Sequence, residues 1–145
     1  MTVHLLKLCV GVDDLDDLRD WHQRRQRVAE KTGEPFTLRH VTRSTPRRAA
    51  EVLDGGSLYW VIRGVIQARQ PVLDLEATVR SDGQPACAIV MAPELVETEW
   101  RPHRAFQGWR YLETRDAPRD IKSGRRRGDK LPAEMERELR ELGLL

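Results

Sequence analysis

The fold is decided by the stretch Leu58-Tyr-Trp-Val-Ile-Arg-Gly-Val-Ile-Gln67 at the centre of the chain. Large apolar side chains stand at every second position from Leu58 to Ile62, and this period of two is typical of a β-strand. Gly64 predicts a bulge or a bend within the run, and Pro71 predicts that the run ends at an edge or a corner of a sheet. We therefore expect the centre of the chain to be rich in strands.

The segments on either side continue this pattern. Residues 72–80 alternate apolar and polar side chains, as expected of a half-exposed strand. Ser81-Asp-Gly-Gln84 predicts a hairpin turn into residues 86–92, which are apolar on both faces and therefore central. We expect residues 3–12, 58–70, 72–80 and 86–92 to form one sheet with 86–92 inside it. Shorter strands are expected at 37–43, 95–100 and 108–112.

Helix signals are found mainly in the first third of the chain. Asp13 or Asp14 is expected to cap a helix that ends at Gly33, and a second, short helix is expected at 47–54 before Gly55-Gly56. The predicted buried stripe of the first helix consists of Leu15, Leu18, Trp21, and Val28 or Ala29. The predicted fold class is α+β, with a curved, mostly antiparallel sheet and two or three helices.

The C-terminal part of the chain has a different composition. We expect one α+β domain over residues 1–121, followed by a basic, flexible linker at 122–130. Residues 131–145 are expected to form an amphipathic helix, because apolar side chains recur at helical spacing at Leu131, Met135, Leu139 and Leu142.

Charge is distributed unevenly along the sequence. Of the 25 basic residues 21 are arginines, and basic residues outnumber acidic ones by six to two over 36–72 and by nine to three over 101–127. Residues 73–100 carry one basic and six acidic residues. Because guanidinium groups bind phosphates and carboxylates bidentately, the basic segments favour an anionic ligand. The alternative is a solvated surface whose arginine content has no binding role.

Several functional classes find no support in the sequence. Its apolar runs are too short to span a membrane, and the N-terminus does not resemble a signal peptide, so we expect a cytoplasmic protein. The four histidines lie far apart and there is no Cys-x-x-Cys motif, so we expect no metal site and no cofactor. Catalytic residues cannot be assigned.

The richest recognition chemistry lies in Arg101-Pro-His-Arg-Ala-Phe-Gln-Gly-Trp-Arg-Tyr-Leu112. Together with the Trp60 strand it predicts a basic cleft lined by aromatic rings, which is typical of sites that hold bases by stacking. The alternative is that these rings are core residues. Trp109 and Tyr111 are expected to share one face. The candidate ligand-binding residues are Trp60, Arg63, Arg69, Gln70, Arg101, His103, Arg104, Phe106, Trp109 and Arg110.

Three blocks resemble an uncharacterised proteobacterial family, a domain of unknown function. The blocks are Val3-His-Leu-Leu-Lys-Leu-Cys-Val-Gly11, Gly55 to Gly64 with Ala68-Arg-Gln70, and Ala105 to Leu112 followed by Asp116-Ala-Pro118. The resemblance covers residues 1–121 and implies a cytoplasmic domain that stands alone. The order of elements is also similar to PUA-like domains, including the ASCH and EVE groups, which bind RNA or modified bases in a cleft.

The functional expectation that follows is a non-catalytic module that binds nucleic acid or a nucleotide, with RNA as a partner. One alternative is a small enzyme that acts on an anionic metabolite, anchored by Arg63, Arg69 or Arg104. Another is a protein-interaction module that acts through the C-terminal helix. The oligomeric state is left open by the sequence.

Overall fold

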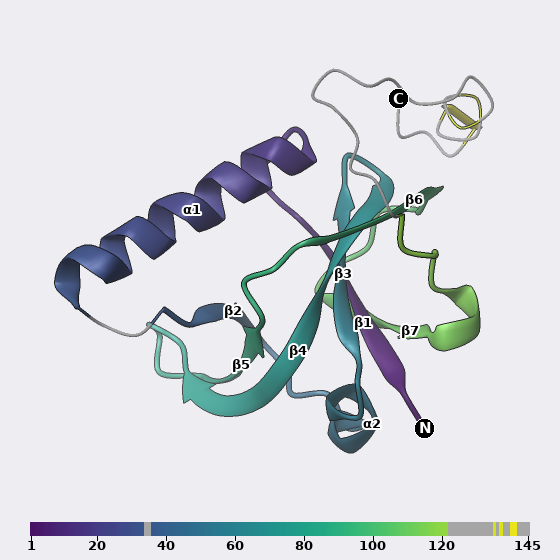
Figure 1. The fold of residues 1–145 in the computed structure, drawn as a ribbon. Helices are drawn as coiled ribbons and strands as arrows, with labels where there is room; N and C mark the ends of the chain where they lie inside the picture. Colours follow the sequence, from purple (N-terminus) through teal and green to yellow (C-terminus); the bar gives the residue numbers. More distant parts are fainter. Residues whose placement is uncertain (34–35, 122–134, 136, 138–139, 142–145) are drawn as a thin grey trace.

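The computed structural model describes residues 1–33 and 36–121, together with residues 135, 137, 140 and 141. Figure 1 shows a strongly curved sheet of seven strands with the long helix α1 beside it. The elements are β1 (Val3–Leu8), α1 (Leu15–Thr32), β2 (Leu38–Thr42), α2 (Ala49–Leu53), β3 (Ser57–Ile62), β4 (Val65–Val79), β5 (Pro85–Met91), β6 (Val96–Pro102) and β7 (Trp109–Glu113), followed by a 3-10 turn at Thr114–Asp116. The chain therefore has the expected α+β class.

The strands form one path in the order β2-β5-β4-β3-β1-β7, and β6 pairs with β4 outside this path. Only the β1–β3 pair is parallel among these strands, so the sheet is mostly antiparallel. The four runs expected in one sheet all belong to it, and β5 lies between β2 and β4 as predicted. The first strand ends at Leu8, earlier than expected, because the chain turns at Gly11 with a φ of 87°.

The turn between β3 and β4 differs from the expectation at Gly64. The bend there is a complete reversal, in which Arg63 and Gly64 adopt φ values of 50° and 78°. Positive φ at both central positions is the geometry of tight hairpin turns whose twist matches that of the strands. The predicted strand 58–70 is therefore two strands, and β4 then continues through Pro71 to Val79.

Pro71 lies at a corner of the sheet, as expected. Before it, β4 pairs with β3 and β6, and after it β4 pairs with β5. The Pro71 carbonyl oxygen still accepts the Ala92 N–H at 2.9 Å, and the Val72 N–H donates to the Gly56 carbonyl oxygen at 3.0 Å. The missing N–H of proline thus falls where the strand changes partners, so no ladder is interrupted.

Helix α1 has the predicted caps and buries only the first part of the predicted stripe, with Leu15 partly buried and Leu18 fully buried. The Asp14 carboxylate accepts the Asp17 N–H at 2.9 Å, and Gly33 ends the helix with a φ of 72°. Leu18 and His22 are the buried residues, whereas Trp21 is 44% exposed and Val28 is 62% exposed. The predicted burial of Trp21 and Val28 is wrong, because the helix is exposed along most of its length after His22.

The core has two parts, one on each face of β1 and β3. The larger cluster fills the concave side and includes Leu5, Leu18, Leu58, Trp60 and Ile62. The smaller cluster lies on the other face and consists of Leu6, Tyr59, Val61, Ile66 and Leu112, with Phe106 and Ala117 packed against it. The sheet is therefore covered by side chains on both faces near its centre.

Two expectations concern the end of the chain. The predicted linker at 122–130 lies outside the described residues, and so does most of the predicted C-terminal helix. The four described residues there, 135, 137, 140 and 141, are helical. In the described part of the chain, no helix combines the length and apolar character needed to cross a bilayer.

Candidate functional site

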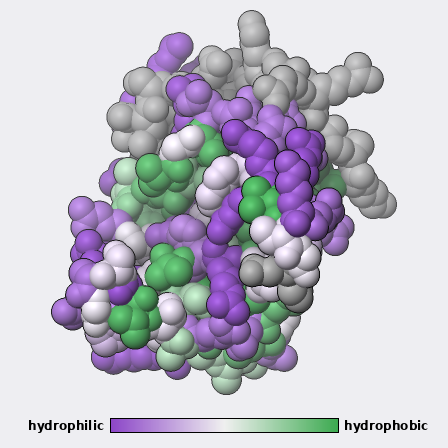
Figure 2. Space-filling model, turned by 90° about the vertical axis from the view of Figure 1, so that its left-hand side faces the viewer, coloured by the Kyte–Doolittle hydropathy of each residue, from purple (hydrophilic) through white to green (hydrophobic). Residues whose placement is uncertain are grey.

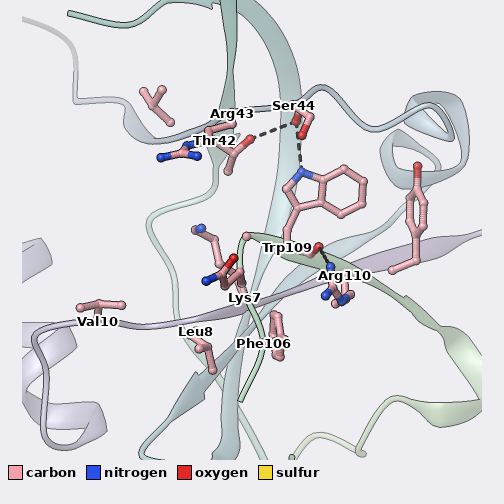
Figure 3. A pocket seen from close by; sticks show the side chains of 13 residues that line it. Lys7, Leu8, Val10, Thr42, Arg43, Ser44, Phe106, Trp109 and Arg110 are labelled. Atoms are coloured by element: carbon pink, nitrogen blue, oxygen red, sulfur yellow. Dashed lines mark hydrogen bonds between the residues drawn. The ribbon is translucent and has the colours of Figure 1, made fainter. Parts of the chain in front are cut away.

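A cleft of about 960 Å³ opens where the curved sheet brings its two edge strands together. Figure 3 shows Arg43 and Ser44, which follow β2, on one side, and Lys7, Leu8 and Phe106 on the other, with Trp109 between them. The lining residues are Lys7, Leu8, Val10, Val41, Thr42, Arg43, Ser44, Phe106, Gln107, Gly108, Trp109, Arg110 and Tyr111. The cleft thus combines β1, the end of β2 and the start of β7.

Trp109 is held in this cleft by both of its neighbouring segments. Lys7 of β1 is its partner in the antiparallel register, so the two side chains lie on the same face of the sheet. The indole Nε1 donates to the Ser44 carbonyl oxygen at 3.1 Å. Trp109 also packs edge-to-face on Tyr111 at 4.8 Å between ring centroids, which confirms that these two rings share a face.

Tyr111 continues the bridge between β7 and the segment that precedes α2. Its hydroxyl accepts the Arg48 N–H at 3.0 Å. The Arg48 guanidinium lies over the Tyr111 ring and donates to Glu113 at 2.8 Å and to Glu51 at 2.7 and 2.9 Å. Arg48 is therefore occupied in joining β7 to α2, and it is not free for a ligand.

As far as the structure describes the chain, three cations and no carboxylate line the cleft. Lys7, Arg43 and Arg110 are all lining residues, and the lining contains neither Asp nor Glu. Among the residues that the structure describes, Arg43 and Arg110 form no ion pair, whereas other arginines such as Arg39, Arg63 and Arg69 do. Burial lowers the pKa of the Lys7 amino group, so a bound anion would stabilise its charged form.

Arg110 lies on the opposite face of β7 from Trp109. Its register partner is Leu6 of the smaller core cluster, and successive side chains of a strand point to opposite faces. The Arg110 guanidinium lies 5.6 Å from the centroid of the Phe106 ring. Arg110 and Lys7 therefore lie on opposite faces of the sheet at its edge strand β7.

Two of the predicted site residues lie in the core instead. Trp60 is 4% exposed and its indole Nε1 donates to the Gln70 Oε1 at 2.8 Å. Gln70 is fully buried and donates its Nε2 to the Ala92 carbonyl oxygen at 3.0 Å. The strands that carry them, β3 and β4, are central in the sheet, which explains why these side chains point into the core.

The predicted arginines do not converge in the cleft, except for Arg110. Arg69 binds the Asp120 carboxylate with two hydrogen bonds of 2.8 Å and the Ser57 hydroxyl with one of 2.9 Å. Arg63, at the tip of the β3–β4 hairpin, pairs with Asp13 at 3.2 Å. Arg69 is thus a structural clamp, and Arg63 lies at another place on the surface.

The remaining predicted residues precede β7. The Arg101 guanidinium donates to the Asp116 carbonyl oxygen, and Arg104 is exposed. The His103 ring packs edge-to-face on Phe106 at 5.2 Å, and its Nδ1 lies 2.8 Å from the Arg104 carbonyl oxygen. Phe106 and Trp109, in contrast, line the cleft as expected.

Lys7 and Arg43 are the cleft cations that sequence reasoning did not identify. Lys7 interrupts the apolar alternation of β1, which is a readable signal for a special position. Arg43 follows a short polar strand and carries no such signal. Its position in the site depends on the approach of β2 to β7, which is a property of the folded sheet.

Other reactive groups lie away from this cleft. His22 is buried and His40 is half-buried, and the buried atoms His22 Nδ1 and His40 Nε2 have no hydrogen-bond partner among the described residues. Burial, aided by the charge of Arg25, lowers the pKa of both to about 4, and Lys7 contributes at His40. Residues 1–33 and 36–121 contain no group of three or more His, Cys, Asp or Glu side chains arranged to hold a metal ion.

The sequence matches one known protein family. A family model described as a protein of unknown function, DUF1489, matches residues 5–145. The chain belongs to the DUF1489 family. The match agrees with the resemblance drawn from the three blocks and also includes residues 122–145, which lie beyond them. No curated protein and no solved structure matches the chain.

Proposed function

We propose that this DUF1489 chain is a cytoplasmic, non-catalytic module that binds single-stranded nucleic acid or a nucleotide in the cleft. The observation that carries the proposal is the composition of the lining, whose described residues include three cations, three aromatic rings and no carboxylate. Aromatic rings accept any base by stacking, and arginine and lysine bind the phosphates.

The arrangement around β7 favours an extended ligand over a single nucleotide. Lys7, Arg43 and Trp109 lie on one side of this edge strand, and Phe106 and Arg110 lie on the other. A ligand that reaches both groups must cross the edge, as a chain of several nucleotides can. A likeness to PUA-like domains, which bind RNA or modified bases between a barrel and a helix, is part of the same proposal.

The alternative is an enzyme acting on an anionic metabolite, anchored by Arg63, Arg69 or Arg104, and none of these three arginines lines the cleft. The described thiols do not favour nucleophilic chemistry, because burial raises the pKa of Cys9 to about 11 and also raises the pKa of Cys87. A thiol with a raised pKa is rarely present as the reactive thiolate. Binding without covalent chemistry is therefore the proposal that the side chains support best.

The test measures binding of a labelled single-stranded RNA of about ten nucleotides by fluorescence anisotropy at low salt. Arg43→Ala is expected to weaken binding by about 1–3 kcal/mol, which is roughly five- to 150-fold. It should also reduce the slope of log K against log salt by about 0.7, the value for one phosphate contact on a single strand.

Arg80→Ala is the matched control, because Arg80 pairs with Asp82 in the β4–β5 hairpin and does not line the cleft. It removes the same charge and is expected to leave the affinity within about twofold, as surface substitutions away from a site do. Equal losses in the two variants would show non-specific attraction. Absence of binding to RNA and to mononucleotides at low salt would refute the proposal.

A further inference from the structure

The C-terminal half of helix α1 extends beyond the core and carries positive charge. From residue 23 to residue 32 every side chain is exposed except that of Ala29, which is half-buried. This half of the helix therefore contributes little to the core. Its charged residues are one acid, Glu30, and four bases, Arg24, Arg25, Arg27 and Lys31. Figure 2 views the molecule from the side on which this half of α1 lies and shows hydrophilic side chains around separate hydrophobic patches.

One strip of this helix combines cations with an aromatic ring. At about 3.6 residues per turn, five side chains fall within about 120° of the helix circumference, and these are Trp21, Arg24, Arg25, Val28 and Lys31. The first four line a shallow groove of about 400 Å³. Trp21 is 44% exposed, and the Arg25 guanidinium lies 4.6 Å from the centroid of its ring. An exposed ring beside cations is typical of sites that stack bases and bind phosphates.

The cations of this strip are available to an anion. Arg24, Arg25 and Lys31 form no ion pair with any residue that the structure describes. The Arg24 Nε donates to the Asp20 carbonyl oxygen of the same helix at 3.4 Å, which leaves the charge of the guanidinium unbalanced. Because no carboxylate neutralises these groups, their field attracts an anionic ligand.

The helix lies on the same face of the sheet as the cleft residues Lys7 and Trp109. Leu18 of α1 belongs to the concave core cluster with Trp60, and Trp109 packs against the same cluster. Lys7 is the register partner of Trp60 in β3 and of Trp109 in β7, so its side chain also lies on this face. A ligand held by Lys7 and Trp109 is therefore on the side of the sheet that α1 covers.

Arg25 of the helix and Lys7 of the cleft both act on one imidazole. His40 of β2 packs edge-to-face on Trp60 at 5.4 Å between ring centroids. Burial, together with the charges of Lys7 and then Arg25, lowers the pKa of this half-buried histidine to about 4. One cation of the cleft and one of the helix thus lie near the same side chain. The positive charge of the cleft therefore continues to α1.

An acidic hollow limits the surface that a polyanion can use on α1. The hollow has a volume of about 330 Å³, shares Val10 with the cleft, and shares Trp21 and Arg24 with the groove. Its lining also includes Asp17 and Asp20, whose charges repel phosphates. A polyanion is therefore directed away from the first turns of α1 and towards its C-terminal half.

We propose that the single-stranded nucleic acid bound in the cleft continues onto the C-terminal half of α1. There a base stacks on the pair formed by Trp21 and Arg25, and phosphates bind Arg24 and Lys31. This inference rests on the proposed function and extends it, because it adds a second contact region that only a longer ligand reaches.

The experiment compares the affinities of two labelled single-stranded RNAs, of about 4 and about 12 nucleotides, by fluorescence anisotropy at low salt. Arg24→Gln combined with Lys31→Gln is expected to weaken binding of the long RNA at least about tenfold. The salt slope of the long RNA should fall by about 1.4, the value for two phosphate contacts on a single strand. Binding of the short RNA should stay within about twofold of the parent chain, because the cleft is unchanged.

Arg80→Gln combined with Arg115→Gln is the matched control, because it removes the same two charges and neither residue lines the cleft or the groove. This control is expected to leave both affinities within about twofold of the parent chain. Comparing each variant with the parent chain at the same RNA length cancels the larger number of binding registers on the long RNA. Far-UV circular dichroism checks that α1 is intact in every variant.

Trp21→Ala tests the stacking contact separately. It is expected to weaken binding of the long RNA about fivefold or more, and Trp21→Phe should recover most of this loss because it keeps a ring. Arg43→Ala, in contrast, should weaken binding of both RNAs, since Arg43 lines the cleft.

The outcomes separate this inference from the proposed function. If both RNAs bind the parent chain and the α1 variants bind the long RNA equally well, the inference is overturned and the proposed function stands. Equal losses for the short and the long RNA would also overturn it, because α1 would then belong to one short site. A parent chain that binds neither RNA would refute both. A dimeric parent chain that becomes monomeric in Trp21→Ala would show that a second copy covers the strip, and it too would overturn the inference.

Discussion

The indole Nε1 of Trp109 donates a hydrogen bond of 3.1 Å to the carbonyl oxygen of Ser44, and this bond joins the two edges of one sheet. The same oxygen accepts the Thr42 hydroxyl at 3.2 Å. One main-chain group therefore holds both a ring of the cleft and the end of β2. The orientation of the Trp109 ring depends on this contact as well as on the strand that carries the ring.

Trp109→Phe is expected to lower the free energy of unfolding by about 0.5–1.5 kcal/mol, because it keeps a ring but removes the N–H donor to Ser44. Urea denaturation measures the change. Trp21→Phe is the control, since Trp21 is exposed and its indole joins no two strands. If the unfolding free energy falls no more in Trp109→Phe than in the control, the bond to Ser44 does not stabilise the fold.

Gly56→Ala is expected to destabilise the protein by at least about 2 kcal/mol, the range of overpacked sites. A Cβ at this position would clash with the carbonyl oxygens of Val3 and Val52, which are main-chain atoms and cannot rotate away. Gly83→Ala is the comparison, because Gly83 has a φ of 84° but nothing within 4 Å of a Cβ. Thermal unfolding should show the larger loss for Gly56→Ala. The opposite order would contradict the close approach of Gly56 to these two carbonyl oxygens.

Arg69→Lys is expected to lower stability by about 1 kcal/mol, because an ammonium group cannot make the paired hydrogen bonds to Asp120. Asp120→Asn should cost a similar amount, and the double variant should cost less than the sum of the two, as in any pair that acts together. Arg115→Lys serves as the control, since Arg115 is exposed and its ion pair with Asp116 is long, at 4.0 Å from Nε to Oδ2. Additive losses at positions 69 and 120 would contradict the clamp.

Acid is expected to weaken the fold through its buried imidazoles. The pKa of His22 is about 4 in the folded protein and 6.5 ordinarily, so the unfolded chain binds more protons between these values. Stability is therefore complete above pH 6.5 and falls as pH decreases towards 4. His22→Gln should reduce the loss of unfolding free energy between pH 7 and pH 5 by about 1–2 kcal/mol. Profiles of the two proteins that stay parallel through this range would disprove the assignment.

Local features of the fold were predictable because they depend on neighbouring residues. Asp14 and Gly33 mark the ends of α1, and the apolar alternation around Leu58 marks the central strands. The exposure of the outer part of α1 was not predictable, since Trp21 and Val28 have the spacing of a core stripe. Whether such a stripe is covered depends on how far the sheet extends beneath it.

The cleft could be predicted only in part for the same reason. Trp60 and Trp109 have similar strand surroundings in the sequence, yet one lies in central strand β3 and the other in edge strand β7. Arg69 and Arg110 likewise differ in their surroundings. Arg69 binds Asp120, which is 51 residues away in the sequence, whereas Arg110 lines the cleft. Ser44 and Trp109 are 65 residues apart, so neither the cleft nor the role of Arg43 follows from local pattern.

The cleft walls are joined by hydrogen bonds between ring side chains and main-chain atoms, and not by a ladder of paired strands. Ser44 with Trp109 and Arg48 with Tyr111 are the contacts that hold β2 and α2 against β7. Substitution of Trp109 or Tyr111 would therefore weaken the contact of β2 and α2 with β7 while every paired strand of the sheet keeps its main-chain hydrogen bonds.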